Sequence, residues 1–245
     1  MPPPSVFQIR YGGYKGVVAI EPTSNHKLSL RQSMLRFKSN NTTLDILNWS
    51  RFLPTFLNHE LIALLSTLGI PDQNFECIQR MMMAYLDQVL VNRETTLDAI
   101  HIVSLEDDQK CLTDMLKAGY SPNNEPYLSM ILQAYKGYQF SLLRTKSQIY
   151  VAKGRSLMGC LDETNNLNYG EVFIQVSKTN IKFYDDGTST YGFNRNENTC
   201  ILQGKVVVAK NACFHPDGIR VLHVVDVPEL HHMVDCLAFP QKGPR

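Results

Sequence analysis

Two stretches of this 245-residue sequence place basic residues beside glycine in a way that suits phosphate binding. The first is Gly12-Gly13-Tyr14-Lys15-Gly16, where backbone amides could approach a phosphate while the Lys15 ammonium neutralises its charge. The spacing is not the G-x-x-x-x-G-K-[ST] of a P-loop. Spacing alone therefore favours a plain hairpin turn over a phosphate site.

The second stretch is a loop that contains Pro216 and Gly218 and is surrounded by Lys210, His215 and Arg220. Basic groups in such a loop could meet a nucleotide or the backbone of a nucleic acid. A solvated loop carries the same charges without binding anything. On spacing alone, the solvated loop is the favoured interpretation.

Other polar pairs favour structural roles over catalysis. Asp162-Glu163 could serve acid–base chemistry, but adjacent carboxylates between a strand and Asn165-Asn166 are typical of a turn. Asp185-Asp186-Gly187 has no third acid at a useful spacing for a metal, so we expect a surface turn. His231 and His232 are adjacent and point in different directions in either a strand or a helix. We expect packing or capping from them, and no metal site.

The composition excludes several classes of protein. A net charge of +1 argues against a strongly basic surface overall, although cations can still cluster locally. The six cysteines show no C-x-x-C pair or zinc spacing, so we expect reduced thiols in a nuclear or cytoplasmic protein. No apolar run approaches the roughly 18 residues of a membrane span, and the start MPPPSV lacks the plan of a signal peptide.

The expected elements run in the order β, α, β. Two strands are expected at residues 6–10 and 15–20, with a tight turn at Gly12-Gly13, followed by a polar stretch to residue 50. A helix with leucines on one face then ends at Gly69, and a second begins at the cap residue Asp72. Two more helices are expected at residues 105–118 and 126–144.

Beyond about residue 147, β-rich segments predominate. Val206-Val207-Val208 and Val221-Leu222 are apolar on both faces, which predicts strands inside a closed barrel. Residues 178–198 are polar and predict a long surface loop. The expected strands lie at residues 148–152, 156–161, 171–176, 205–210, 220–227 and 234–239.

A series of runs resembles, in the same order, the core of the cellular, plant-type RNA-dependent RNA polymerases of RNA silencing. Because the runs are long and keep the family order, we identify the chain as a member. They lie at residues 7–18 (FQIRYGGYKGVV), 28–37 (LSLRQSMLRF), 64–71 (LLSTLGIP), 125–130 (EPYLSM), 154–163 (GRSLMGCLDE), 169–175 (YGEVFIQ), 204–220 (GKVVVAKNACFHPDGIR) and 230–245 (LHHMVDCLAFPQKGPR).

The resemblance implies a mixed α/β (α+β) fold in which two double-psi β-barrels face each other across a cleft. Residues 1–50 would form the C-terminal part of the first barrel, residues 51–146 a helical connector, and residues 147–245 the N-terminal part of an incomplete second barrel. Two residues of the first barrel and three of the second would contact the phosphates of a nucleotide or RNA. These are Arg10, Lys15, Lys210, His215 and Arg220.

The resemblance also implies an RNA-directed RNA polymerase, a nucleotidyltransferase that makes double-stranded RNA from a single-stranded RNA template and nucleoside triphosphates for siRNA production. The family holds catalytic Mg²⁺ with an Asp-x-Asp-Gly-Asp motif, which would follow Arg245. We therefore expect no metal ligands and no polymerase activity in this chain, with nucleus or cytoplasm as its location and other silencing proteins as possible partners. The alternative is a truncated, non-catalytic paralogue that acts at most as an RNA-binding or interaction fragment.

Two departures from the family pattern lie in the second basic loop. Ala212 stands where the family usually has proline, and the usual Gly-Asp order is reversed as Asp217-Gly218. Because glycine tolerates positive φ, we expect the reversal to shift where this backbone can bend.

Overall fold

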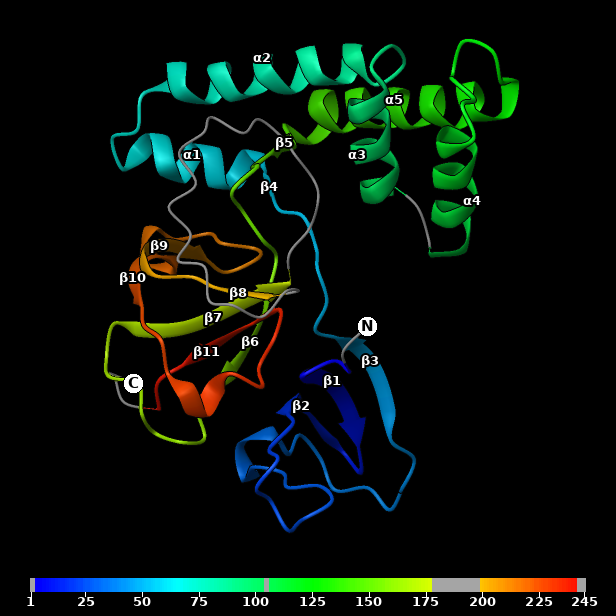
Figure 1. Ribbon diagram of the computed structural model, residues 1–245. Helices are drawn as coiled ribbons and strands as arrows, with labels where there is room; N and C mark the ends of the chain where they lie inside the picture. Colours follow the sequence, from blue (N-terminus) through cyan, green and yellow to red (C-terminus); the bar gives the residue numbers. More distant parts are fainter. Residues whose placement is uncertain (1–2, 104–105, 178–198, 242–245) are drawn as a thin grey trace.

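The computed structural model describes residues 3–103, 106–177 and 199–241, and they form a mixed α/β protein with several sheets (Figure 1). The mixed fold class predicted from the sequence is confirmed. Two sheets lie in the lower part of the view in Figure 1, and the helices lie above them. Within the described ranges, no helix combines the length and apolar character needed to cross a bilayer.

An antiparallel sheet of three strands occupies the N-terminal part of the chain. Strand β1 (Val6–Tyr11) lies between β2 (Tyr14–Ala19) and β3 (Asp45–Trp49). A short 3-10 turn, η1 (Gln32–Met34), follows β2. The predicted hairpin is confirmed. Strand β3 was not predicted, because the sequence analysis assigned that stretch to a polar connection.

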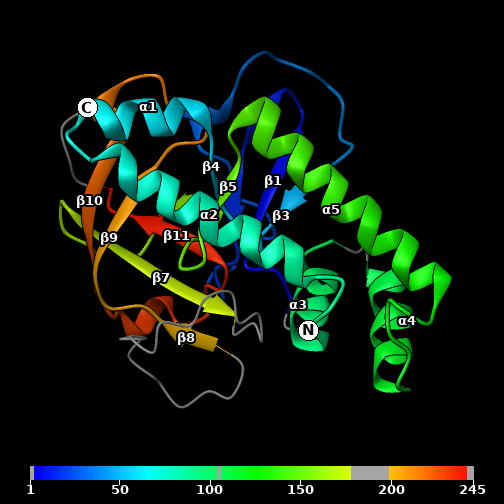
Figure 2. The ribbon, with the colours of Figure 1, turned by 90° about the horizontal axis from the view of Figure 1, so that it is seen from above.

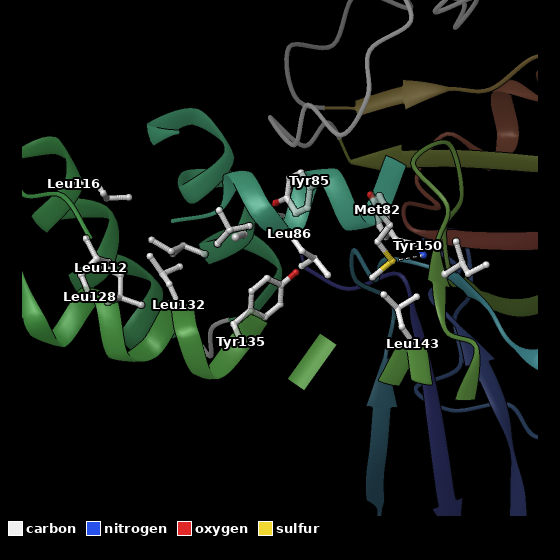
Figure 3. Packing of buried hydrophobic residues seen from close by; sticks show 14 residues of the cluster. Met82, Tyr85, Leu86, Leu112, Leu116, Leu128, Leu132, Tyr135, Leu143 and Tyr150 are labelled. Atoms are coloured by element: carbon white, nitrogen blue, oxygen red, sulfur yellow. Dashed lines mark hydrogen bonds between the residues drawn. The ribbon is translucent and has the colours of Figure 1, made fainter. Parts of the chain in front are cut away.

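Five helices follow: α1 (His59–Thr67), α2 (Asp72–Gln88), α3 (Arg93–Val103), α4 (Glu106–Lys117) and α5 (Pro126–Lys146). Asn58 caps α1 by accepting a hydrogen bond from the Leu61 amide, and Pro126 opens α5 as predicted. Helix α3 was missed by the sequence analysis. Helices α2 to α5 share a core of buried side chains that runs from Leu116 in α4 to Tyr150 beyond α5, and Ile62 of α1 packs against it (Figure 3).

A two-stranded ribbon ties the helices to the rest of the chain. Strand β4 (Phe56–Leu57) pairs with β5 (Ile149–Tyr150), so the segment that enters the helical region lies beside the segment that leaves it. The Phe56 and Tyr150 rings meet edge to face with centroids 5.5 Å apart. The Tyr150 amide also donates a hydrogen bond to the Met82 sulfur at 3.4 Å (Figure 3).

A larger sheet forms the C-terminal part, in the order β6-β11-β7-β10-β9, with β8 also paired to β7. Its pairings are parallel between β6 and β11 and between β7 and β10. Central strand β7 is buried on both faces, with Phe173 in one apolar cluster and Val172 and Ile174 in another. The strands are β6 (Met158–Leu161), β7 (Glu171–Ser177), β8 (Thr199–Ile201), β9 (Gly204–Ala209), β10 (Ile219–Val224) and β11 (Cys236–Phe239).

One expectation about this sheet is wrong. Val206-Val207-Val208 and Val221-Leu222 are not buried on both faces, because Val207 and Val221 are each 65% exposed and lie opposite each other in the β9–β10 pair. Strand β9 lies at the edge of the sheet, and only its alternate side chains, such as Val206, pack inward. The β8 strand was not predicted, and residues 178–198, predicted as a loop, lie outside the described residues.

The two sheets are joined through Ser5 and Val6. Val6 is fully buried in the same cluster as Phe173. The Ser5 hydroxyl donates to the His232 carbonyl at 3.0 Å and accepts from the Val234 amide at 2.9 Å. The start of β1 is therefore held against the segment that leads into β11.

Candidate functional site

The first candidate site lies on the β1–β2 hairpin, where two cations face each other. Arg10 and Lys15 are direct partners in the antiparallel register, and both side chains are exposed. Arg10 also lies opposite Asp45 of β3. Because directly opposite residues share one face of a sheet, these three side chains form a row across all three strands. The structure therefore brings two predicted phosphate-binding residues together.

The turn of this hairpin also contacts part of the polar stretch that follows β2. Gly12 and Gly13 both have positive φ, +54° and +86°, as a two-residue hairpin turn requires. The Gly13 carbonyl accepts hydrogen bonds from the Arg36 amide at 3.0 Å and the Phe37 amide at 3.5 Å. A Cβ added at Gly13 would lie 1.9 Å from the Phe37 carbonyl oxygen, so only glycine allows this approach.

The same interaction brings a third cation, Arg36, beside the turn, and its side chain is exposed. Sequence reasoning did not select Arg36. The available signal was its position in the 28–37 run that resembles the polymerase family, close in space to the 7–18 run.

The second candidate site is the loop between β9 and β10 together with the start of β10, where the other three predicted residues lie. Lys210 follows β9 directly, and its side chain is exposed. His215 caps the 3-10 turn η2 (Pro216–Gly218), where its Nδ1 accepts from the Asp217 amide at 3.3 Å. The Asp217 carboxylate lies 3.2 Å from the same Nδ1.

Arg220 is also tied to this turn, because its Nε donates to the Asp217 carbonyl at 3.4 Å. Lys210 and His215 therefore lie in the loop and Arg220 lies at the start of β10, and Asp217 offsets part of their charge.

The backbone of this loop bends at an unexpected residue. Ala212 adopts the left-handed region at φ +62°, which proline cannot reach because its ring fixes φ near −65°. Gly218 is not among the glycines with positive φ, and a Cβ there would lie 2.5 Å from the Cys213 sulfur. The expectation that the Asp217-Gly218 reversal moves a positive-φ position is therefore wrong. Gly218 is needed for close packing, and Ala212 makes the bend.

The structure does not bring the two candidate sites together. Figures 1 and 2 both show the β9–β10 hairpin on one side of the β-rich part and the β1–β2 hairpin on the other, with β7 and β11 between them. Arg10 and Lys15 form one surface, and Lys210, His215 and Arg220 form another.

The turn predicted at Asp162-Glu163 is present and has a structural role. The buried Asp162 carboxylate accepts hydrogen bonds from the Thr164 hydroxyl and from the amides of Thr164, Asn166 and Leu167. Burial by itself raises the pKa of this carboxyl, but these hydrogen bonds outweigh burial and hold the pKa below its usual value of 3.8. Because its oxygens are occupied within the turn, Asp162 is not available for acid–base chemistry.

Neighbouring Glu163 joins three of the family-like runs. It forms an ion pair with Arg31, and the Gln241 amide donates to its carboxylate at 3.4 Å and to the Asp162 carbonyl at 2.7 Å. These interactions tie the segment before β3 to the ends of β6 and β11. The role of Glu163 is to hold these segments together.

The paired histidines have separate partners, so the packing interpretation is confirmed. His231 lies 2.5 Å from an Asp226 carboxylate oxygen and stacks on the Phe173 ring. His232 Nε2 lies 3.0 Å from the Ile20 carbonyl oxygen. Across the part of the chain that the structure describes, no three His, Cys, Asp or Glu side chains are grouped so that they could hold a metal ion. Asp185-Asp186-Gly187 lies outside the described residues.

All six cysteines are free thiols, as predicted. Cys160 and Cys236 are buried beside each other, and the hydrogen bond between them lowers the pKa of Cys160 and raises that of Cys236. This pair lies in the apolar cluster around Phe173, so we assign it to the core.

Comparison with known proteins adds three findings. The family model described as "RNA dependent RNA polymerase" matches residues 1–245. The chain is 49% identical over 242 residues to the probable RNA-dependent RNA polymerase 1 of Oryza sativa subsp. japonica, and this match covers 99% of this chain and 31% of that protein. It is 48% identical over 242 residues to RNA-dependent RNA polymerase 1 of Arabidopsis thaliana, and this match covers 99% of this chain and 21% of that protein.

Among solved structures, the fold is similar to the RNA-dependent RNA polymerase QDE-1 from Thielavia terrestris, with a TM-score of 0.67 at 19% identity. That match covers 98% of this chain and 28% of the other. The chain thus spans about a fifth to a third of the length of the relatives it matches.

Proposed function

The chain belongs to the RNA-dependent RNA polymerase family, and from this premise we propose that it forms part of the core of an RNA-directed RNA polymerase. The whole protein would copy single-stranded RNA into double-stranded RNA for siRNA production and gene silencing. Its substrates would be an RNA template and nucleoside triphosphates. We place it in the nucleus or cytoplasm, where other silencing proteins would be its partners.

For the architecture, we propose that β1, β2 and β3 belong to a first double-psi β-barrel and that β6 to β11 belong to a second. Two β-rich segments on either side of a helical segment support this assignment, as does the similarity of fold to a polymerase of known structure. The helices α1 to α5 would then be the connector between the barrels.

The observation that carries the proposal is the direct pairing of Arg10 and Lys15 across the β1–β2 hairpin. Two exposed cations on one face, with Arg36 beside the turn, can bind the phosphates of a nucleotide or an RNA strand. During phosphoryl transfer, such cations stabilise the charge that develops on the phosphate oxygens. Lys210, His215 and Arg220 would bind a second part of the RNA backbone.

The family's Mg²⁺ organises attack and departure of the reacting phosphate groups when it is bound. The residues described here do not fit that ion, because no three potential ligands are grouped among them and Asp162 is committed to its turn. We derive no catalytic step through a metal in this chain.

RNA binding at the hairpin can be tested with a charge-matched pair of variants. The double variant Arg10→Ala/Lys15→Ala should bind a single-stranded RNA oligonucleotide more weakly. The slope of its log K against log [salt] should become shallower by about 0.7 for each phosphate that the protein no longer neutralises. The control Arg80→Ala/Lys110→Ala removes two exposed cations from α2 and α4 and should leave the slope unchanged. Equal weakening in both variants would contradict the assignment.

As a second candidate, we propose that residues 1–245 on their own bind RNA without catalysis, because no three potential metal ligands are grouped among the residues that the structure describes. On this proposal, residues 1–245 assayed alone should bind RNA but incorporate no nucleotides in a template-directed assay with Mg²⁺. Double-stranded product in that assay would refute the proposed inactivity of the chain.

A further inference from the structure

A tryptophan and an arginine are presented side by side where β3 ends. Ser50 lies between them and is buried, and its hydroxyl oxygen accepts hydrogen bonds from the amides of Ser5 at 2.8 Å and Val6 at 3.2 Å. In an extended chain, residues two apart share a face. Anchoring Ser50 inward therefore turns Trp49 and Arg51 outward together.

The two outward side chains touch. The Arg51 guanidinium carbon lies 5.2 Å from the centroid of the Trp49 ring, within cation–π range, and the ring is still 41% exposed. Strand β3 is an outer strand of its sheet, as Figure 1 shows. The indole is thus held in position while part of its surface stays open to solvent.

A second pair of the same kind follows along the chain. The Arg155 guanidinium carbon lies 4.6 Å from the centroid of the Phe52 ring, and both residues are half-buried. Arg155 Nη1 donates to the Gly154 carbonyl at 3.0 Å, which fixes the side chain. A second aromatic–guanidinium pair is therefore present at Phe52, three residues after Trp49.

We propose that Trp49 and Arg51 form a stacking platform for a nucleobase of single-stranded RNA. The proposal rests on the proposed function, since it needs an RNA strand on this chain. A base stacks on the exposed part of the indole, and the guanidinium binds an adjacent phosphate. The alternative occupant is an apolar surface of another protein. Such a surface could pack on neighbouring Ile46, which is 51% exposed, but it would leave the Arg51 charge desolvated and unpaired.

The chain carries its own probe for this site, because Trp49 is its only tryptophan. We would titrate residues 1–245 with a fluorescein-labelled oligo(U) and oligo(A) of about ten nucleotides at low salt. Anisotropy of the label measures binding, and tryptophan emission measures contact with the base. Binding of either oligonucleotide should quench the emission, whereas inorganic polyphosphate, which has no bases, should compete for the cations without quenching.

Variants separate stacking from charge. Trp49→Ala should weaken RNA binding by roughly 5- to 150-fold, the range for one stacked base, and Trp49→Phe should recover much of the loss. The matched control Tyr138→Ala removes a ring that is 61% exposed on α5 and should change nothing. In Arg10→Ala/Lys15→Ala, affinity should fall while the quenching at saturation persists.

The outcomes are distinguishable. The platform would be overturned if RNA bound without any change in Trp49 emission, or if Trp49→Ala bound RNA with unchanged affinity. Either result would leave the proposed function standing and would assign this surface to a protein contact. Absence of RNA binding by the unmodified chain at low salt would overturn both proposals. The quenching measurement needs no variant, so it stands even if Trp49→Ala fails to fold.

Discussion

Gly13→Ala should destabilise this protein far more than an alanine at an equally unusual but open position. Gly13 has φ +86°, and its added Cβ would lie 1.9 Å from the Phe37 carbonyl oxygen. Gly69 has φ +97°, and nothing lies within 4 Å of the Cβ position. Both substitutions impose the same backbone cost, about 1–2 kcal/mol for a left-handed alanine. Only the first also meets a neighbouring backbone.

The additional cost at Gly13 follows from what must move. Relief of the clash requires the Phe37 backbone to retreat by about 1 Å, which breaks the hydrogen bonds that the Arg36 and Phe37 amides donate to Gly13. Each such bond contributes about 0.5–1.5 kcal/mol. We therefore expect Gly13→Ala to lower the free energy of unfolding by about 2–5 kcal/mol, against about 1–2 kcal/mol for Gly69→Ala.

Urea denaturation of both variants measures this difference, and hydrogen exchange at the Arg36 amide localises it. Exchange at Arg36 should accelerate in Gly13→Ala and stay unchanged in Gly69→Ala. Equal losses of stability in the two variants, with Arg36 still protected, would refute the close approach of Phe37 to the turn.

Two further predictions concern the C-terminal part. Ala212→Gly should raise the free energy of unfolding by up to about 1 kcal/mol, because it relieves a left-handed alanine. Ala212→Pro should lower the free energy of unfolding, because proline cannot adopt φ +62°. A proline variant that is fully stable in urea denaturation would contradict this conformation of the loop. For Asp162, the folded-state pKa lies below the usual 3.8, so the carboxylate stabilises the fold above about pH 4 and this contribution is lost as the pH falls through the folded pKa. Urea midpoints of wild type and Asp162→Asn should therefore differ near neutral pH and converge in acid, and a gap that stays constant with pH would count against the hydrogen-bonded carboxylate.

The hairpin and its cations could be predicted because the turn length fixes them. A two-residue turn at Gly12-Gly13 sets Tyr11 opposite Tyr14, and Arg10 then falls opposite Lys15. The third cation at this surface could not be predicted, because Arg36 arrives through an interaction between segments far apart in sequence.

Elements were missed where polar residues occupy buried positions or apolar residues occupy exposed ones. Helix α3 contains Thr96, which is fully buried and donates its hydroxyl proton towards the carbonyls of Val89 and Asn92. A threonine at a core position hides the apolar period of a helix. In β3, Ile46 and Trp49 are both exposed, so the strand has no alternating pattern and is defined by its pairing with β1.

The bend at Ala212 shows a different limit of sequence reasoning. Glycine is the residue expected at positive φ, so the sequence predicts the bend near Gly218. In the folded loop, the Cys213 sulfur fills the space next to Gly218, and the bend falls on alanine instead. Packing decides which of the two small residues adopts positive φ, and local sequence propensity does not predict packing.

The Ser5 hydroxyl bridge also constrains how the protein is made. At about 5–20 residues per second, roughly 10–45 s of translation separate Ser5 from His232, which lies 227 positions later. During that interval the helices can assemble from interactions between nearby residues. Val6 stays exposed, because residues that bury it in the folded protein have not yet been synthesised. We therefore expect the N-terminal sheet to need protection from aggregation until β11, which shares the Val6 cluster, emerges from the ribosome.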